Sequence, residues 1–318
     1  MKLKEIYNIA LETGKKADPR GAKAVQESMD SRKQVFENLT PEDQKHYDTE
    51  CLEVPYADTR ILLGDPDAQI TGIIAGIDME VPEILLADRL NEKGENINLI
   101  LSHHPEGKAL AELYQVMGMQ ADVWHKFGVP INIGDILIGK RAAEVQRSLM
   151  PYNHNRSVDA AKLLGFNYMT CHTAADNQVV TFVQKKMDDG KPARVRDVVR
   201  ILRKIPEYAK AAKEGMGPTI IVGDNSKRAG KVFVDMTGGT EGPKEIIEKL
   251  ADAGVGTIVA MHVGDKLRKK AEDSHVNVVI AGHIASDAVG MNLFLDELEK
   301  KGMKKIITTS GLTRVKRI

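Results

Sequence analysis

This sequence predicts an α/β fold in which short buried strands alternate with helices. From about residue 56 onward, β-rich runs alternate with stretches of helical periodicity, the pattern of βα units. Hydrophobic residues make up 42% and charged residues 28% of the 318 positions, which is typical of a globular protein with a sizeable core. The first 55 residues contain no strand-like run, so we expect a helical N-terminal segment in front of the α/β part.

The N-terminal segment, residues 1–55, carries apolar residues at helix spacing both before and after a break at Pro19. Thr40 followed by Pro41 predicts a further helix start, with Thr40 as the N-cap. Nothing in this segment suggests chemistry. Its expected role is packing, within one subunit or between subunits.

The remaining chain, residues 56–318, divides into alternating elements. The expected strands are 70–77, 97–102, 129–133, 167–171, 219–222, 231–236, 257–261, 276–281 and 305–309. The expected helices are 81–93, 108–127, 134–149, 194–214, 243–253, 265–272 and 286–301. No repeat or low-complexity linker marks a boundary, and the polar stretch 187–192 is the best candidate for a seam.

Charge and hydropathy exclude several classes of function. Lysine plus arginine equals aspartate plus glutamate at 45 each, so no global field favours nucleic acid. The basic residues Arg314, Lys316 and Arg317 are expected to be a solvated tail. No run approaches the roughly 18 apolar residues of a membrane span, and no signal-peptide pattern is visible, so we expect a cytoplasmic protein without membrane contacts.

The two cysteines, Cys51 and Cys171, cannot form a thiolate cage or a disulfide scaffold. Any metal must therefore be held by histidines and carboxylates. The chain contains no P-loop and no G-x-S-x-G pattern, which disfavours an NTPase or a serine hydrolase.

Five of the nine histidines follow the C-terminal end of an expected strand. They are His103, His104, His172, His262 and His283. In open α/β sheets these strand ends form the crevice where ligands bind, so the five side chains should converge. A lone histidine there is typically a hydrogen-bonded structural residue, but five at one class of position indicate a site.

Two of these histidines are followed by an acid four residues later, as His172 with Asp176 and His283 with Asp287. In a first helical turn this spacing places both side chains on one face. Imidazole and carboxylate are ligands for divalent transition metals. The sequence therefore favours metal ligation over a purely structural role for these residues.

The pair His103 and His104 cannot both face one side of a regular strand. Because Pro105 takes the chain out of the ladder, the two rings can fan around one cleft or serve different ions. The glycine-rich turn 237–242 is open to two interpretations. Its backbone N–H groups could face an anion, or it is a tight turn that needs positive φ; Glu241 would repel phosphate.

Several of these segments occur in a recognisable order, namely SHHP, H-T-x-x-D, GG-x-x-G and AGH-x-x-x-D. Together they resemble the GTP cyclohydrolase I type 2 homologue family, also called the Nif-three-like family, over most of residues 56–318. The resemblance implies two related, intertwined α/β/α units that enclose a metal site at the strand ends, with halves of about 56–186 and 187–318. It also implies a homohexamer, without the middle domain of the larger members.

The resemblance further implies one or two divalent ions per chain, such as Zn, Fe, Mn, Ni or Co. The implied ligands are His103, His104, Asp176, His283 and Asp287. The sequence departs from the family at Asp287, where a glutamate shared between two metals is usual. It departs again at VAMHVGDK, where a TG-acid stretch precedes a histidine in the family.

These observations lead to a metal-dependent hydrolase that acts on a small nucleotide-like or phosphorylated substrate. His172 or His262 is the expected general acid or base, although His172 could instead orient Asp176. The competing hypothesis is a non-catalytic metal-binding or scaffold protein, which a coordination shell closed to water would favour.

Overall fold

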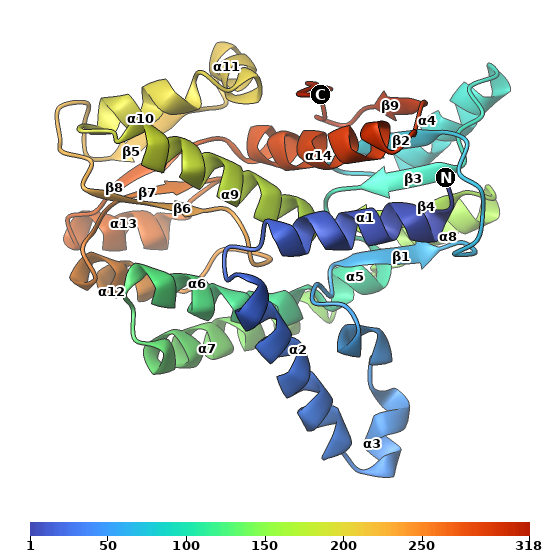
Figure 1. Ribbon diagram of the computed structural model, residues 1–318, viewed down its shortest axis with the longest axis horizontal. Coiled ribbons are helices and arrows are strands. Elements are labelled where there is room, and N and C mark those ends of the chain that lie inside the picture. Colours follow the sequence, from blue (N-terminus) through green and yellow to red (C-terminus); the bar gives the residue numbers. More distant parts are fainter.

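A computed structural model describes residues 1–318, and in it two sheets lie side by side (Figure 1). The first sheet has the strand order β1-β4-β3-β2-β9 and the second has the order β5-β8-β7-β6. The first-sheet strands are β1 Thr59–Leu63, β2 Ile73–Gly76, β3 Leu99–Ser102, β4 Asn167–Cys171 and β9 Ile306–Thr308. The second-sheet strands are β5 Thr219–Val222, β6 Lys231–Asp235, β7 Val255–Ala260 and β8 Asn277–Ile280.

Each sheet is parallel except for one edge strand. In the first sheet β1 pairs antiparallel with β4, and in the second β5 pairs antiparallel with β8. The other neighbours pair in parallel. Parallel strands are buried on both faces by their crossover helices, so each sheet needs two helical layers.

The chain has fourteen α-helices, of which α1, α2 and α3 precede the first strand. Their bounds are α1 Leu3–Lys16, α2 Ala22–Glu37, α3 Pro41–His46, α4 Val81–Glu92, α5 Gly107–Ala111, α6 Met119–Phe127, α7 Ile131–Leu149, α8 Arg156–Leu163, α9 Thr173–Gly190, α10 Val195–Leu202, α11 Pro206–Lys213, α12 Ile246–Asp252, α13 Asp265–Asp273 and α14 His283–Lys300. None of them is long and apolar enough to cross a membrane.

The first sheet is covered by α1, α9 and α14 on one face. Leu99 and Met169 of the strands pack there with Ile6 of α1 and Phe294 of α14. On the other face, Ile100 and its neighbours pack against α4 and α8. The alternation of side chains along each strand thus feeds two separate cores.

The second sheet has the same three-layer arrangement. Phe233 of β6 packs with α6, α7, α12 and α13, whereas Val234 packs with α9 and α10 on the opposite face. Helix α9 contributes Ala174 to the core of the first sheet and Val183 to that of the second. The two α/β/α units are therefore intertwined, as the family resemblance implies.

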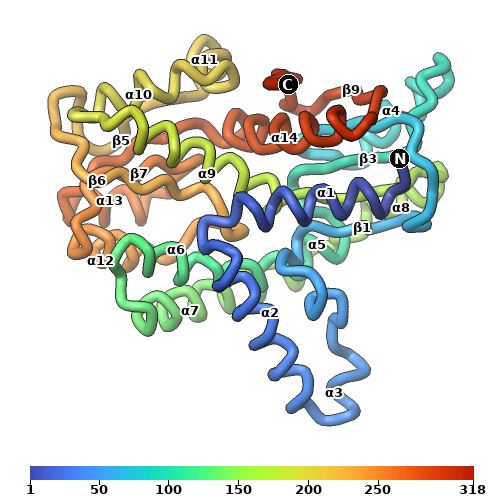
Figure 2. The backbone as a smooth tube through the Cα atoms, viewed as in Figure 1, coloured from blue at the N-terminus to red at the C-terminus, as the bar shows by residue number.

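The chain passes from the first sheet into the second and then returns. After β8 it enters α14 and ends in β9, which pairs in parallel with β2. In Figure 2 the red C-terminal end accordingly lies beside the teal strands of the first sheet. Helices α2 and α3 project from the body as an arm (Figure 1). Arg32 of α2 donates hydrogen bonds to the backbone carbonyls of Cys51, Val54 and Pro55, which ties α2 to the segment that leads into β1.

Most expected elements are confirmed, and the exceptions have physical causes. The expected strand at 129–133 is wrong, because Pro130 is the N-cap of α7 and the apolar run belongs to its first turn. The expected helix 194–214 is two helices, since Pro206 begins a new one. The sequence analysis did not find β1, α8 or α9. Thr40 caps α3 as predicted, accepting a hydrogen bond from the N–H of Asp43.

Candidate metal centre

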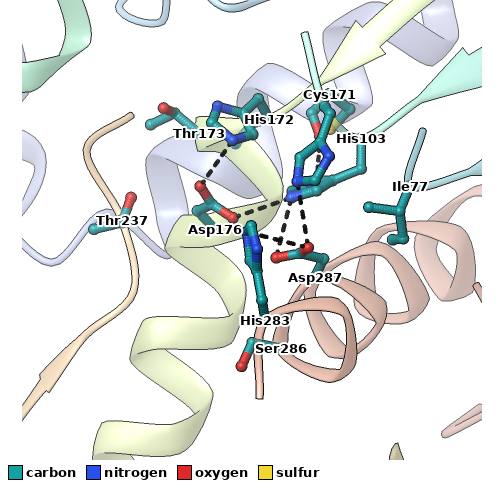
Figure 3. Close-up of polar contacts among 12 residues, drawn as sticks. Ile77, His103, Cys171, His172, Thr173, Asp176, Thr237, His283, Ser286 and Asp287 are labelled. Atoms are coloured by element: carbon teal, nitrogen blue, oxygen red, sulfur yellow. Dashed lines mark hydrogen bonds and ion pairs between the residues drawn. The ribbon is translucent and has the colours of Figure 1, made fainter. Parts of the chain in front are cut away.

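Four of the five predicted ligands, His103, Asp176, His283 and Asp287, lie together with His172 (Figure 3). The fifth, His104, contacts Asp287. His103 and His104 follow β3, while His172 follows β4 and immediately precedes α9. Asp176 lies in the first turns of α9, and His283 and Asp287 lie in those of α14. The ends of β3, β4 and β8 and the N-termini of α9 and α14 therefore converge on one point. This is expected for the carboxyl edges of parallel strands.

The turn before α14 depends on a glycine. Gly282 has a φ of +114°, and a Cβ at this position would lie 2.6 Å from the backbone oxygen of Met216. Only glycine adopts this conformation without strain. The A-G-H sequence thus positions His283 at the first residue of α14.

His103 is fully buried, and its two ring nitrogens have different roles. Nδ1 lies 3.1 Å from the backbone oxygen of Cys171. A carbonyl can only accept, so Nδ1 carries the proton and Nε2 keeps its lone pair. That Nε2 lies 3.4 Å from Asp176 Oδ1 and 3.4 Å from Asp287 Oδ1. His103 therefore presents an electron pair between two carboxylates.

Two further aspartates orient two of the other histidines. His172 Nδ1 lies 2.8 Å from Asp58 Oδ2, and His104 Nδ1 lies 2.7 Å from Asp78 Oδ1. Asp58 also accepts a hydrogen bond from the hydroxyl of Thr173 at 2.6 Å. A carboxylate behind a histidine is the usual partner of a metal-ligating imidazole, because it fixes the tautomer and the ring orientation.

The remaining nitrogens point to the same two carboxylates. Asp287 Oδ2 lies 3.5 Å from His104 Nε2 and 3.6 Å from His283 Nε2. His172 Nε2 lies 3.7 Å from Asp176 Oδ2. In each H-x-x-x-D pair the histidine and the aspartate therefore lie on the same face of their own helix, as the spacing predicts.

These separations fit an ion better than hydrogen bonds. Four buried atoms at the centre have no hydrogen-bond partner, namely His103 Nε2, Asp176 Oδ1 and both carboxylate oxygens of Asp287. Unpartnered buried polar atoms are costly. Ligand atoms placed about 2.1 Å from a tetrahedral ion lie about 3.4 Å apart, which matches the observed distances. The cluster can hold a divalent metal ion.

The geometry divides the cluster into two overlapping sets. His103, His172 and Asp176 have ligand atoms within 4.8 Å of one another, and so do His103, His104 and Asp287. Because His103 has a single free lone pair, it can belong to only one set at a time. His283 lies beside the second set through its contact with Asp287.

The pKa values reflect burial and charge within the cluster. Burial raises the pKa of Asp176 to about 6 and lowers that of His283 to about 4. Burial also lowers the pKa of His104, but Asp287 and Asp78 outweigh it and raise the value to about 10. Burial opposes ionisation of Asp287, yet the surrounding histidines hold its pKa well below the usual value. Asp287 is thus a buried negative charge.

His262 lies at the edge of the site. It is exposed, and its ring centroid is 4.9 Å from that of His283. Both residues line a pocket that also reaches His172, Asp176 and Asp287. The structure therefore places His262 next to the cluster, outside the two candidate ligand sets. Asp265, five residues after the end of β7, is exposed and pairs with Arg268.

The glycine-rich turn 237–242 forms part of the same pocket. Gly238 and Gly239 have φ values of +94° and +86°, which favours the interpretation as a tight turn. Glu241 Oε1 accepts a hydrogen bond from the N–H of Gly264 at 2.7 Å. The Glu241 carboxylate therefore adds a negative charge to the pocket at this turn, which disfavours an anion there.

Asp58 and Asp78 were missed by the sequence analysis. Asp78 follows the expected strand 70–77, so the strand-end rule that was applied to the histidines would have found it. Asp58 precedes β1, a strand that the sequence analysis did not find, and no local pattern connects it with His172.

No family model matches the sequence, and no curated protein gives a significant match. Solved structures do match. A NIF3 superfamily protein from Sphaerobacter thermophilus superposes with a TM-score of 0.73 at 23% identity, covering 97% of this chain and 98% of that one. Reduced HcgD from Methanocaldococcus jannaschii superposes with a TM-score of 0.50 at 15% identity, covering 78% of this chain and 87% of that one. The chain thus adopts the fold of the NIF3 superfamily protein, the fold that its sequence motifs resemble.

Proposed function

We propose that this protein is a divalent-metal-dependent hydrolase for a small nucleotide-like or phosphorylated substrate. One observation carries the proposal: Asp176 and Asp287, whose buried carboxylate oxygens lack partners, line a pocket, and the unpartnered His103 Nε2 lies 3.4 Å from both. A closed structural site would have no such pocket beside it. A divalent ion in this position supplies Lewis acidity, which activates water and neutralises charge on a substrate oxygen.

The ligands fall into two groups in this proposal. His103, His172 and Asp176 would hold one ion, and His104, His283 and Asp287 would hold the other. This assigns His172 to metal binding, because Asp58 fixes its ring with Nε2 directed at Asp176. If the protein binds a single ion, that ion would lie in the set to which His103 contributes its lone pair.

His262 is then the preferred general acid or base. It lines the pocket and is exposed, so it can exchange protons with solvent. In hydrolysis His262 would accept a proton from the attacking water or donate one to the leaving oxygen or nitrogen. Its ring lies near His283, which keeps it within reach of a substrate at the cluster.

The test combines metal analysis with turnover. Protein purified without chelator should contain one or two divalent ions per chain, and hydrolysis of a panel of phosphoesters, nucleotides and cyclic amides should include one chelator-sensitive reaction. Its rate should rise with pH around neutrality. His262→Gln should retain the metal and lose roughly a hundredfold or more in turnover. The exposed His46→Gln serves as the matched control.

Absence of chelator-sensitive turnover in metal-loaded protein would favour the second candidate, a non-catalytic metal-binding or scaffold protein. The unpartnered cluster supports that candidate equally, whereas the pocket favours catalysis. Assembly as a homohexamer stays a prediction, which light scattering would test.

A further inference from the structure

The pocket extends from the metal cluster across the carboxyl end of the second sheet. It contains about 700 Å³ of empty space, part of it open to solvent. Beyond the cluster its wall is formed by the ends of β6 and β7, by the turn 237–242, and by α12 and α13. The apolar part of this wall includes Ile247, Ile258, Leu267 and Val278.

The cavity exists because small and polar residues replace core residues at the ends of β6 and β7. Side chains alternate along a strand, so Asp235 faces the same side of the sheet as Phe233. Phe233 fills the core, whereas Asp235 is followed by the turn and lines the pocket. Its partner on β7 is Ala260, which has only a methyl group. A carboxylate and a methyl group thus stand where larger apolar side chains would close the core.

The Asp235 carboxylate has no donor beside it. Burial and, as the smaller cause, the negative charge of Glu241 together raise its pKa to about 7. One carboxylate oxygen of Glu241 accepts a hydrogen bond from the N–H of Gly264, and the other oxygen accepts none. No lysine or arginine lines the pocket. The far wall therefore combines two carboxylates and an apolar surface, and Arg141, which donates to the backbone oxygen of Glu241, does not line the pocket.

A second observation, at the opposite end of the same pocket, points to a bound ligand. The carboxylates of Asp176 and Asp287 are 4% and 0% exposed, lack partners for three of their oxygens, and line the same pocket at its other end. The pocket thus has a cation-binding floor and a separate acidic wall. An anionic group can be neutralised only at the floor, by the metal.

We propose that the wall formed by Asp235 and Glu241 selects ligands with an amidine or amine group on an apolar body. The apolar body would pack against Ile258 and Leu267, and its N–H donors would meet the two carboxylates. This inference rests on the proposed function for the opposite end of the ligand, whose anionic or hydrolysable group would lie at the metal. It deepens that proposal by assigning the chemistry of the second binding contact.

The test compares benzamidine with benzamide, a neutral probe of the same shape, on zinc-loaded protein. At pH 8 Asp235 is ionised, and calorimetry should give benzamidine at least about tenfold tighter binding than benzamide, as expected for a charge-assisted bidentate contact. Asp235→Asn keeps the side-chain shape and should reduce this preference to within about twofold. Asp265→Asn removes an exposed acid next to the pocket and should leave the preference unchanged.

Glu241→Gln provides an independent variant, because its amide oxygen can still accept from Gly264. It should also reduce the preference, and it decides the question if Asp235→Asn does not fold. Equal binding of the two probes to the wild type would overturn the inference, and so would an equal loss of benzamidine binding in Asp265→Asn.

The readout is separate from hydrolysis. Metal content of each variant is measured alongside, and it should match the wild type because neither carboxylate belongs to the cluster. Selective benzamidine binding without any turnover would refute the hydrolase and retain the inference. Chelator-sensitive turnover without a preference for benzamidine would support the hydrolase and refute the inference.

Discussion

At the scale of single residues, the aspartates behind the histidines define the site as much as the candidate ligands do. Asp58 and Asp78 each accept from a histidine Nδ1, which leaves Nε2 directed at the cluster. Asp58 is fully buried and also holds Thr173. Such contacts pre-orient a ligand ring before the ion arrives, so they contribute to affinity without touching the metal.

Asp58→Asn should weaken metal affinity by about tenfold to a hundredfold, because the amide is a poorer acceptor for the Nδ1 proton of His172. Competition with a chromophoric chelator measures the change. Asp159→Asn alters an exposed aspartate on α8 and should have no effect. Identical affinity in both variants would mean that Asp58 serves only to position Thr173 and the start of α9.

At the scale of elements, the crossing of α9 and α14 fixes the distance between the two H-x-x-x-D pairs. Gly290 of α14 lies against the backbone of α9, and a Cβ there would be 2.5 Å from the backbone oxygen of Ala175. A side chain of any size would separate the helices. Since each helix carries a carboxylate of the cluster, the crossing also fixes the distance between Asp176 and Asp287.

Gly290→Ala should destabilise the protein by about 1–3 kcal/mol, the usual cost of overpacking, and should lower its metal content. Denaturant unfolding of the metal-free protein measures the first effect and elemental analysis the second. Gly139→Ala on α7 meets nothing within 4 Å and should stabilise by about 0.5–1 kcal/mol through helix propensity. A neutral Gly290→Ala would show that the helices can shift apart freely.

The elements also show what local sequence could and could not predict. Strands 167–171 and 219–222 carry β-rich runs and lie where the sequence places them. The helix after His172 was missed because α9 is buried on several sides, so its residues show no amphipathic stripe to read. At 129–133 a short apolar run was taken for a strand, since a run of this length does not distinguish strand from helix.

The candidate site was more predictable than the fold around it. Strand ends followed by histidines, and acids at i+4 spacing, are local patterns that identify His103, His172 and Asp287. Contacts such as Asp58 with His172 join residues 114 positions apart. Nothing in either local segment encodes that pairing, which arises only when β1 pairs with β4.

At the scale of the whole molecule, the metal centre joins segments that are distant in sequence. Its candidate ligands come from the end of β3, from the start of α9 and from the start of α14, so an ion would link both α/β/α units. The ligands are brought together only in the folded state. Metal binding should therefore be coupled to global stability.

Metal at a hundred times its dissociation constant should stabilise the fold by about 2.7 kcal/mol. Thermal unfolding of chelator-treated protein, repeated with added zinc, measures the resulting rise in Tm. Asp287→Asn removes the carboxylate that lies between His103, His104 and His283, and its Tm should respond much less to zinc. An equal rise in both proteins would indicate binding elsewhere on the surface.

The first sheet is completed by β9, the last strand in the chain, which constrains the order in which the two sheets form. Strand β2 has β3 on one side and β9 on the other, and β9 spans Ile306–Thr308. Until residue 308 is available, β2 remains an open sheet edge, which is a hazard for aggregation. The second sheet lies wholly before this point in the chain and can form first. During synthesis the first sheet would thus be completed only after the second sheet, when β9 pairs with β2.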